Sequence, residues 1–157
     1  MRLERANALP SIVIRDLTTK DEHAIAFDEA AYSLDTMGSY EFETTNLRFA
    51  YSSMTTPSEV YDYDMVKRTR TLRKRQEIPS GHNAADYVTT RIMAKAQDGA
   101  EVPVSILHRR GLTLDGAAPL LLYGYGSYGM AMPASFNANR LSLVDRGFVY
   151  ALSLIHI

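Results

Sequence analysis

Short strand candidates separated by polar turns recur at intervals of about ten residues through the first half of the chain. Residues 11–17 are rich in β-branched side chains, residues 47–53 alternate with three large apolar side chains on one face, and residues 59–64 alternate again. This spacing predicts an all-β sandwich, barrel or propeller. Propeller blades take about 40–45 residues each, so residues 1–75 would supply one to two blades, which cannot bury both faces without neighbours.

The second half of the chain has a different order of predicted strands and helices. An Asp98-Gly99 hairpin turn joins two strand candidates, and Pro103 predicts that the return strand is an edge strand or is bulged. A later strand is continuously apolar, which predicts cover on both faces. Hairpin, strand, helix and strand in this order are typical of the opening of an α/β sheet. The expected elements are strands 87–94, 101–108, 119–123 and 148–152, with a helix within 134–146 that ends at Gly147.

Charge divides the chain at the same place. Residues 1–66 carry five basic and twelve acidic groups, residues 67–75 carry six basic and no acidic groups, and the remainder is balanced, for a net charge of −1. Pro79 and Gly81 follow the basic run, so residues 76–86 are predicted to be a linker. The basic run is interpreted as a solvated last strand that balances the acidic zone, with phosphate contact as the alternative.

Composition excludes several classes of protein. The chain has no cysteine, which excludes disulfides, thiolate metal sites and a cysteine nucleophile. No metal-binding motif or cofactor motif of good fit is found, so neither is expected. Near-zero net charge gives no reason to expect a nucleic-acid partner, and a longest apolar stretch of about ten residues falls short of the ~20 of a membrane span. No signal peptide is seen, and a cytoplasmic location is expected.

The most conspicuous motif is Gly124-Tyr125-Gly126-Ser127-Tyr128-Gly129, directly after an apolar strand. It has the G-x-G-x-x-G pattern of a dinucleotide site, but Pro133 interrupts any helix that begins at Gly129. Ser127 lacks the first glycine of a G-x-S-x-G nucleophile elbow. A tyrosine held between glycines at a strand end can donate its hydroxyl to an oxyanion, and the alternative is a pair of packing tyrosines in a glycine-rich turn.

The motif and its surroundings carry a resemblance. Residues 121–129 resemble the oxyanion loop of the prolyl oligopeptidase family of serine peptidases, and the flanks resemble its oligopeptidase B branch, also called protease II. Residues 98–105 and 140–151 resemble the hairpin and the helix–strand unit of its catalytic domain. Residues 48–57 resemble its last propeller blade.

The resemblance implies a fragment of a two-domain protein. Its family fold is a seven-bladed β-propeller on an α/β-hydrolase domain, which puts the C-terminal blade or blades in residues 1–75, a linker in 76–86 and the start of the peptidase domain in 87–157. It also implies a serine-type endopeptidase that takes short basic peptides and cuts after Arg or Lys. Tyr125 matches the oxyanion-hole tyrosine, and Tyr128 matches an aromatic residue that lines the S1 pocket.

Three departures from the family pattern limit what this chain is expected to do. The Ser/Asp/His triad is absent, so the isolated chain is predicted to be inactive. Residues 152–157 do not continue the family pattern and resemble a translated sequencing adapter, so they are interpreted as a non-native tail. Pro133 and Ser135 stand where relatives carry acidic residues, which weakens the case for a basic P2 preference. The alternatives left open are a non-catalytic propeller-like interaction module and a nucleotide-binding oxidoreductase.

Overall fold

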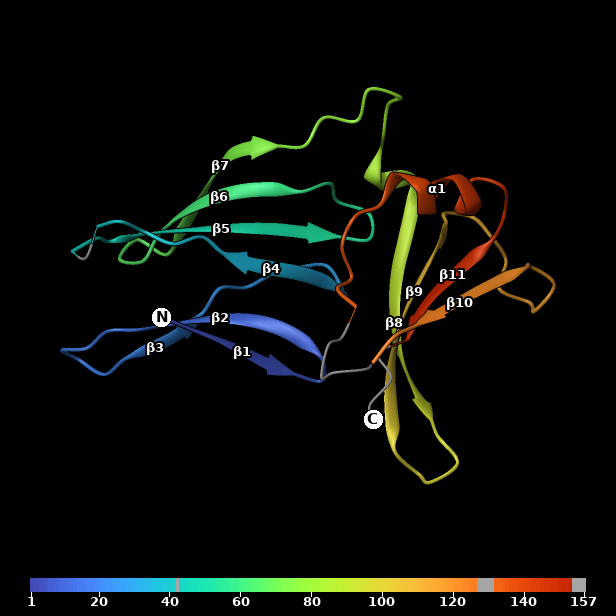
Figure 1. The fold of residues 1–157 in the computed structure, drawn as a ribbon, viewed down its shortest axis with the longest axis horizontal. Helices are drawn as coiled ribbons and strands as arrows, with labels where there is room; N and C mark the ends of the chain where they lie inside the picture. Colours follow the sequence, from blue (N-terminus) through green and yellow to red (C-terminus); the bar gives the residue numbers. More distant parts are fainter. Residues whose placement is uncertain (42, 127–131, 154–157) are drawn as a thin grey trace.

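The computed structural model describes residues 1–41, 43–126 and 132–153, and Figure 1 shows three sheets at two ends of the molecule. The first sheet is an antiparallel meander with strand order β1-β2-β3. The second is a four-stranded antiparallel meander with order β4-β5-β6-β7. The strands are β1 Arg2–Ala6, β2 Leu9–Arg15, β3 Glu22–Ala24, β4 Tyr32–Thr36, β5 Asn46–Ser53, β6 Glu59–Asp64 and β7 Thr69–Arg75.

The first two sheets pack face to face through an apolar layer. Ile12 and Ile14 of β2 lie in one buried cluster with Leu47, Phe49 and Tyr51 of β5. The three β5 residues share a face because side chains alternate along a strand, as the sequence predicts. Two adjacent meanders that bury their facing sides are the arrangement expected of neighbouring blades.

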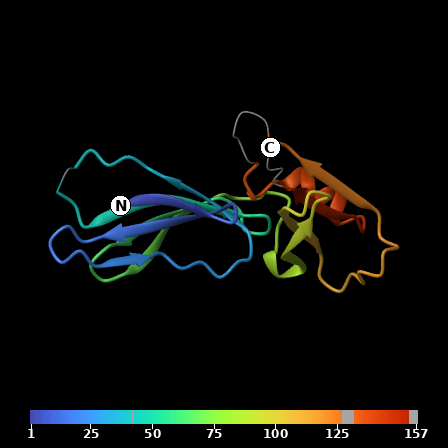
Figure 2. The same ribbon diagram turned by 90° about the horizontal axis from the view of Figure 1, so that it is seen from below.

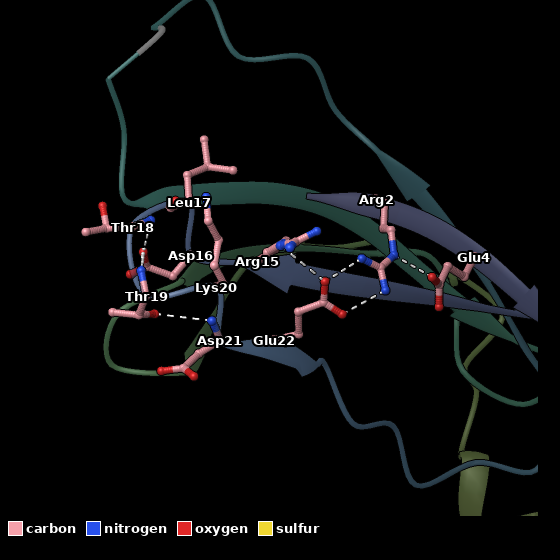
Figure 3. Close-up of polar contacts among 10 residues, drawn as sticks. All are labelled: Arg2, Glu4, Arg15, Asp16, Leu17, Thr18, Thr19, Lys20, Asp21 and Glu22. Atoms are coloured by element: carbon pink, nitrogen blue, oxygen red, sulfur yellow. Dashed lines mark hydrogen bonds and ion pairs between the residues drawn. The ribbon is translucent and has the colours of Figure 1, made fainter.

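A polar turn and an ion pair hold the outer end of the first sheet (Figure 3). The Asp16 carboxylate accepts hydrogen bonds from the backbone N–H groups of Thr18 (2.7 Å) and Thr19 (3.0 Å), which closes the predicted turn between β2 and β3. Arg2 of β1 donates two hydrogen bonds to the carboxylate of Glu22 of β3, at 2.7 and 2.9 Å. These bonds lower the pKa of the Glu22 carboxyl.

The basic run forms β7, whose residues are all exposed. Two of its arginines pair with acidic residues of the neighbouring strand, since Arg73 lies 3.1 Å from Asp62 and Arg75 lies 2.7 Å from Glu59. The described contacts therefore fit the solvated-strand interpretation.

The third sheet has strand order β10-β11-β9-β8 and lies at the other end of the molecule (Figures 1 and 2). Its pairs are antiparallel except β10 with β11, which run parallel and are connected through the helix α1. Gly147, with φ +89°, follows the helix, as expected of a glycine C-cap. The elements are the 3₁₀-helix η1 Ala84–Asp86, β8 Tyr87–Lys95, β9 Glu101–Arg109, β10 Leu120–Gly124, α1 Ala138–Val144 and β11 Val149–Ser153.

One sequence expectation for this sheet is wrong. Strand β9 is internal, between β8 and β11, although it contains Pro103. The proline is tolerated because its described pairing with β11 begins one residue later, at Val104. Strand β10 is exposed along its whole length, because within the described residues only β11 pairs with it. The cover on both faces that its apolar run predicts stays a prediction for the longer protein.

Strand β11 has the burial that the sequence predicts. Residues 149–152 are buried, and Leu152 is 1% exposed. The first two residues of the predicted non-native tail, Leu152 and Ser153, thus continue the strand and pair with Tyr123 and Gly124 of β10. The rest of that tail lies outside the described residues.

Candidate functional site

Tyr125 lies at the edge of the third sheet where two parallel strands end. Strand β10 ends at Gly124, which is opposite Ser153, the last residue of β11. Tyr125 follows directly, and its side chain is exposed, with 38% of the residue surface accessible. The carboxyl ends of parallel strands are where α/β sheets assemble their sites, so this phenol is well placed to meet a ligand.

The remainder of the glycine-rich motif lies outside the described residues, including Ser127, Tyr128 and Gly129. The segment 132–137 that follows is not helical, and α1 begins only at Ala138, where the Asn137 side chain caps it. A dinucleotide site needs a helix that opens at the third glycine. The non-helical segment 132–137 therefore argues against the oxidoreductase hypothesis.

The segment after the motif is held from both sides. On one side, Arg140 of α1 donates to the carbonyl of Ser135 (2.9 Å) and stacks over the Tyr150 ring at 4.4 Å. On the other side, the Ser52 hydroxyl of β5 accepts a hydrogen bond from the backbone N–H of Phe136 at 3.0 Å. The second contact joins the four-stranded sheet to the segment that leads out of the motif. Pro133 is exposed and Ser135 is half-buried in this segment.

The turn between β5 and β6 contacts the other end of the molecule. Met54 is fully buried in a cluster with Leu107 and Leu152 of the third sheet and Val144 of α1. The Nε2–H of His82, in the segment between β7 and η1, donates to the carbonyl oxygen of Thr55 at 2.6 Å, because a carbonyl oxygen can only accept.

His82 also packs against aromatic rings of the third-sheet end. Its ring stacks on Tyr87 at 5.6 Å and meets Phe136 edge-on at 4.9 Å. The linker predicted from Pro79 and Gly81 thus has a fixed contact with each neighbour.

One carboxylate organises this turn from within the four-stranded part. Glu29, in the connection between β3 and β4, accepts four hydroxyl hydrogen bonds, two at each oxygen. Tyr51 and Thr56 (3.0 Å) donate to Oε2, and Ser53 and Thr55 (both 2.6 Å) donate to Oε1. Burial, reinforced by the bond to Glu29, raises the pKa of the Tyr51 phenol.

Sequence reasoning missed Glu29, Ser52 and His82 as residues that hold the site. Their signal is the density of hydroxyl groups in the segment 52–56, which would need a buried acceptor once the turn packs against another element.

A cavity of about 920 Å³ lies beside this turn, lined among others by Glu29, Tyr51, Glu59 and His82. Tyr125 is not among its lining residues. Four carboxylates line it, and two of them are already hydrogen-bonded, Glu29 to the turn and Glu59 to Tyr61 and Arg75. These two carboxylates therefore belong to the framework of the fold.

Three titratable groups of this end form a structural cluster. Asp145, at the C-terminal end of α1, accepts from the Tyr87 hydroxyl (2.9 Å) and pairs with Arg109 (2.7 Å). Burial, with the bond to Asp145, raises the pKa of Tyr87. Within the described ranges, no group of three His, Cys, Asp or Glu residues could hold a metal ion, and no helix is long and apolar enough to cross a membrane.

Comparison with known proteins gives matches along the chain. Residues 2–76 match the family model of the prolyl oligopeptidase N-terminal β-propeller domain. The chain is 42% identical to dipeptidyl aminopeptidase BI of Pseudoxanthomonas mexicana over 153 residues, which is 97% of this chain and 21% of that protein. It is 24% identical to Protease 2 of Moraxella lacunata over 131 residues, 83% of this chain and 19% of that protein.

Solved structures match both ends of the molecule together. Oligopeptidase B from Trypanosoma brucei, with covalently bound antipain, superimposes with a TM-score of 0.86 at 31% identity, over 96% of this chain and 22% of that one. Oligopeptidase B from Leishmania major superimposes with a TM-score of 0.83 at 30% identity, over 95% of this chain and 22% of that one. The chain spans about a fifth of the length of these relatives. The expected fold, a propeller end followed by the opening of a second domain, is confirmed, and the chain belongs to the prolyl oligopeptidase family of serine peptidases.

Proposed function

We propose that this chain is the part of a serine oligopeptidase that carries an oxyanion-hole tyrosine, and that the whole protein hydrolyses short basic peptides after Arg or Lys. The observation that carries the proposal is the position of Tyr125, exposed at the carboxyl edge of the parallel pair β10–β11 and flanked by Gly124 and Gly126. The similarity to two oligopeptidase B structures supports the specificity.

The proposal assigns a role to each tyrosine of the motif. In acyl transfer the scissile carbonyl becomes an oxyanion, and the Tyr125 hydroxyl donates a hydrogen bond to it. Tyr128 lines the pocket for the P1 side chain, where an aromatic ring attracts the guanidinium of arginine. The nucleophile, the general base and the acid that orients it belong to the remainder of the protein, and the isolated chain is inactive. The division into residues 1–75, 76–86 and 87–157 and the cytoplasmic location are part of the same proposal.

Tyr125→Phe in the full-length peptidase tests the first role, because it removes the hydroxyl and keeps the ring. Loss of one oxyanion donor costs about 10²–10³ in kcat, or roughly 2.7–4 kcal/mol. We expect that loss in kcat with little change in KM, since the bond strengthens in the transition state. Tyr128→Ala is expected to raise KM for Arg-P1 substrates instead. A kcat for Tyr125→Phe within about twofold of the parent would mean that Tyr125 is a packing residue.

The 42% identity to a dipeptidyl aminopeptidase favours a second specificity, release of N-terminal dipeptides. Two Arg-P1 substrates separate the candidates, one with a free amino terminus two residues before the scissile bond and one with a blocked terminus. Cleavage of the blocked peptide supports the oligopeptidase. Cleavage of the free dipeptidyl substrate alone would assign the protein to the aminopeptidases.

A further inference from the structure

We propose that Glu29 is a positioning residue for the peptidase reaction, and that it acts through the β5–β6 turn on the segment that carries Tyr125. This rests on the proposed function of Tyr125. Glu29 itself lies in the connection between the two meander sheets, in the other part of the molecule from β10 and α1. The described hydrogen bonds lead from Glu29 through the turn to Phe136, and from there the chain leads back to Tyr125 through residues 127–131, which lie outside the described residues.

The first step of the path is the geometry at Ser53. Its Oγ accepts hydrogen bonds from the backbone N–H groups of Thr55 (3.0 Å) and Thr56 (2.8 Å), which occupy both lone pairs. The hydroxyl proton must therefore be donated, and the Glu29 carboxylate is its nearer acceptor at 2.6 Å, while the Thr55 hydroxyl lies at 3.2 Å. Ser53 is fully buried, so water cannot replace this acceptor.

The second step is that a carboxylate is required at position 29. An ionised carboxylate offers about four acceptor positions and no donor, which matches the four hydroxyl groups that point at Glu29. An amide of the same shape has one oxygen and one NH₂ group. If the NH₂ group took the place of Oε1, it would face the Ser53 hydroxyl, which donates its proton to this oxygen. If it took the place of Oε2, it would face the Tyr51 hydroxyl, which donates to that oxygen.

The third step leads from the turn to the motif. Ser52 is buried, and its hydroxyl donates to the Thr56 carbonyl (3.1 Å) while it accepts from the N–H of Phe136 (3.0 Å). The position of Thr56, set by Glu29, thus orients the oxygen that holds Phe136. Phe136 belongs to the segment between the glycine-rich motif and α1, and Tyr125 lies at the other end of that motif.

Positioning matters here because oxyanion donors act only over a narrow range of geometry. A misplacement of 1 Å in a reacting arrangement can cost about 10²-fold in rate. We expect Glu29→Gln in the full-length peptidase to misplace the donor by less than 1 Å and therefore to lower kcat about tenfold. The KM for an Arg-P1 substrate should stay within twofold of the parent.

A double-mutant cycle distinguishes positioning from general loss of stability. If Glu29 acts through the Tyr125 hydroxyl, Glu29→Gln should cost less than twofold in kcat once Tyr125→Phe has removed that hydroxyl. The Tyr125→Phe single variant decides the proposed function by itself. The comparison of the two backgrounds decides the role of Glu29.

Glu59→Gln is the matched control. Glu59 is a buried carboxylate of the same sheet, 3% exposed, and its carboxylate bonds run to Tyr61 and Arg75 instead of to the turn. It should lower the thermal midpoint without the loss in kcat. If Glu29→Gln does not fold, as judged by circular dichroism and elution volume, Ser52→Ala enters the cycle in its place, because it removes the acceptor for Phe136 directly.

A kcat loss in the parent that vanishes in the Tyr125→Phe background, with Glu59→Gln unaffected, supports the proposal. Three results would overturn it. The first is a kcat within twofold of the parent for Glu29→Gln, or for Ser52→Ala where that variant replaces it. The others are an equal loss of kcat in the parent and in the Tyr125→Phe protein, or the same loss of kcat in the Glu59→Gln control.

Discussion

The exposed strand β10 predicts that the isolated 157-residue chain associates with itself. Leu120, Leu122 and Tyr123 are 60%, 61% and 43% exposed in a strand that only β11 pairs within the described residues. A strand edge with unpaired backbone groups and apolar side chains is a template for another copy. We expect the purified chain to be insoluble, self-associated or partly unfolded.

Leu122→Lys tests whether this strand is the cause. Full burial of a leucine side chain contributes about 1.5–3 kcal/mol, and 61% of Leu122 is still accessible, so covering it leaves about 0.9–1.8 kcal/mol to drive association. A lysine removes that gain and adds repulsion between copies. Size-exclusion chromatography with light scattering, at equal concentrations, should show a larger monomer fraction for Leu122→Lys than for the parent.

Leu17→Lys is the control for this prediction. Leu17 is 78% exposed but lies in the turn between β2 and β3, outside any strand, so its substitution should leave the monomer fraction unchanged. In the full-length peptidase we expect Leu122→Lys to have the opposite sign and to lower the yield of folded protein. The reasoning fails if the parent chain elutes as a monomer with a sharp cooperative melt, or if Leu17→Lys improves solubility as much.

Three further predictions concern activity, the junction and titration. The purified 157-residue chain should not hydrolyse an Arg-P1 substrate faster than a no-enzyme blank, because an oxyanion donor supplies neither the nucleophile nor the general base. Turnover in material free of contaminating protease would contradict this. Met54→Ala should cost about 2–5 kcal/mol in the full-length protein and speed proteolysis in the linker, and unchanged urea midpoint and cleavage would refute the buried contact. Burial and the hydrogen bond to Glu59 raise the pKa of the Tyr61 phenol to about 12, from about 10 in the unfolded chain. The protonated phenol therefore contributes fully to the free energy of unfolding below pH 10, and this contribution is lost as the pH rises to 12. Tyr61→Phe should reduce that alkaline loss and remove a late step from the phenolate absorbance titration, and an unchanged titration would rule the shift out.

Periodicity predicted most strands of this fold, and the strands it missed have a common physical reason. Strand β1 is exposed at every residue, and β4 is short with one buried residue, so neither shows the alternation that a half-buried strand imposes. Each is defined by pairing with a strongly patterned neighbour, β2 for one and β5 for the other. Pairing of this kind depends on the fold around a strand and not on its own side chains.

The candidate site was predictable only where its residues are close in sequence. Tyr125 stands out because strand, glycines and tyrosine are contiguous. The Glu29 cluster does not, because its hydroxyl donors lie 22 to 27 residues further along the chain and meet the carboxylate only when β5 has paired. The cover on β10 could not be assigned for a related reason, since an apolar run shows that a strand needs cover and not which segment supplies it.

Two kinds of contact join the two ends of the molecule, apolar burial and a directional hydrogen bond. Burial of Met54 is non-directional, and its truncation should cost about 2–5 kcal/mol. The Ser52–Phe136 hydrogen bond contributes only about 0.5–1.5 kcal/mol, but it tolerates little change in distance or angle. Loss of Met54 should therefore separate the two ends. Loss of Ser52 or Glu29 should leave them docked and out of alignment, which is why kcat, and not stability alone, is the measurement that distinguishes their roles.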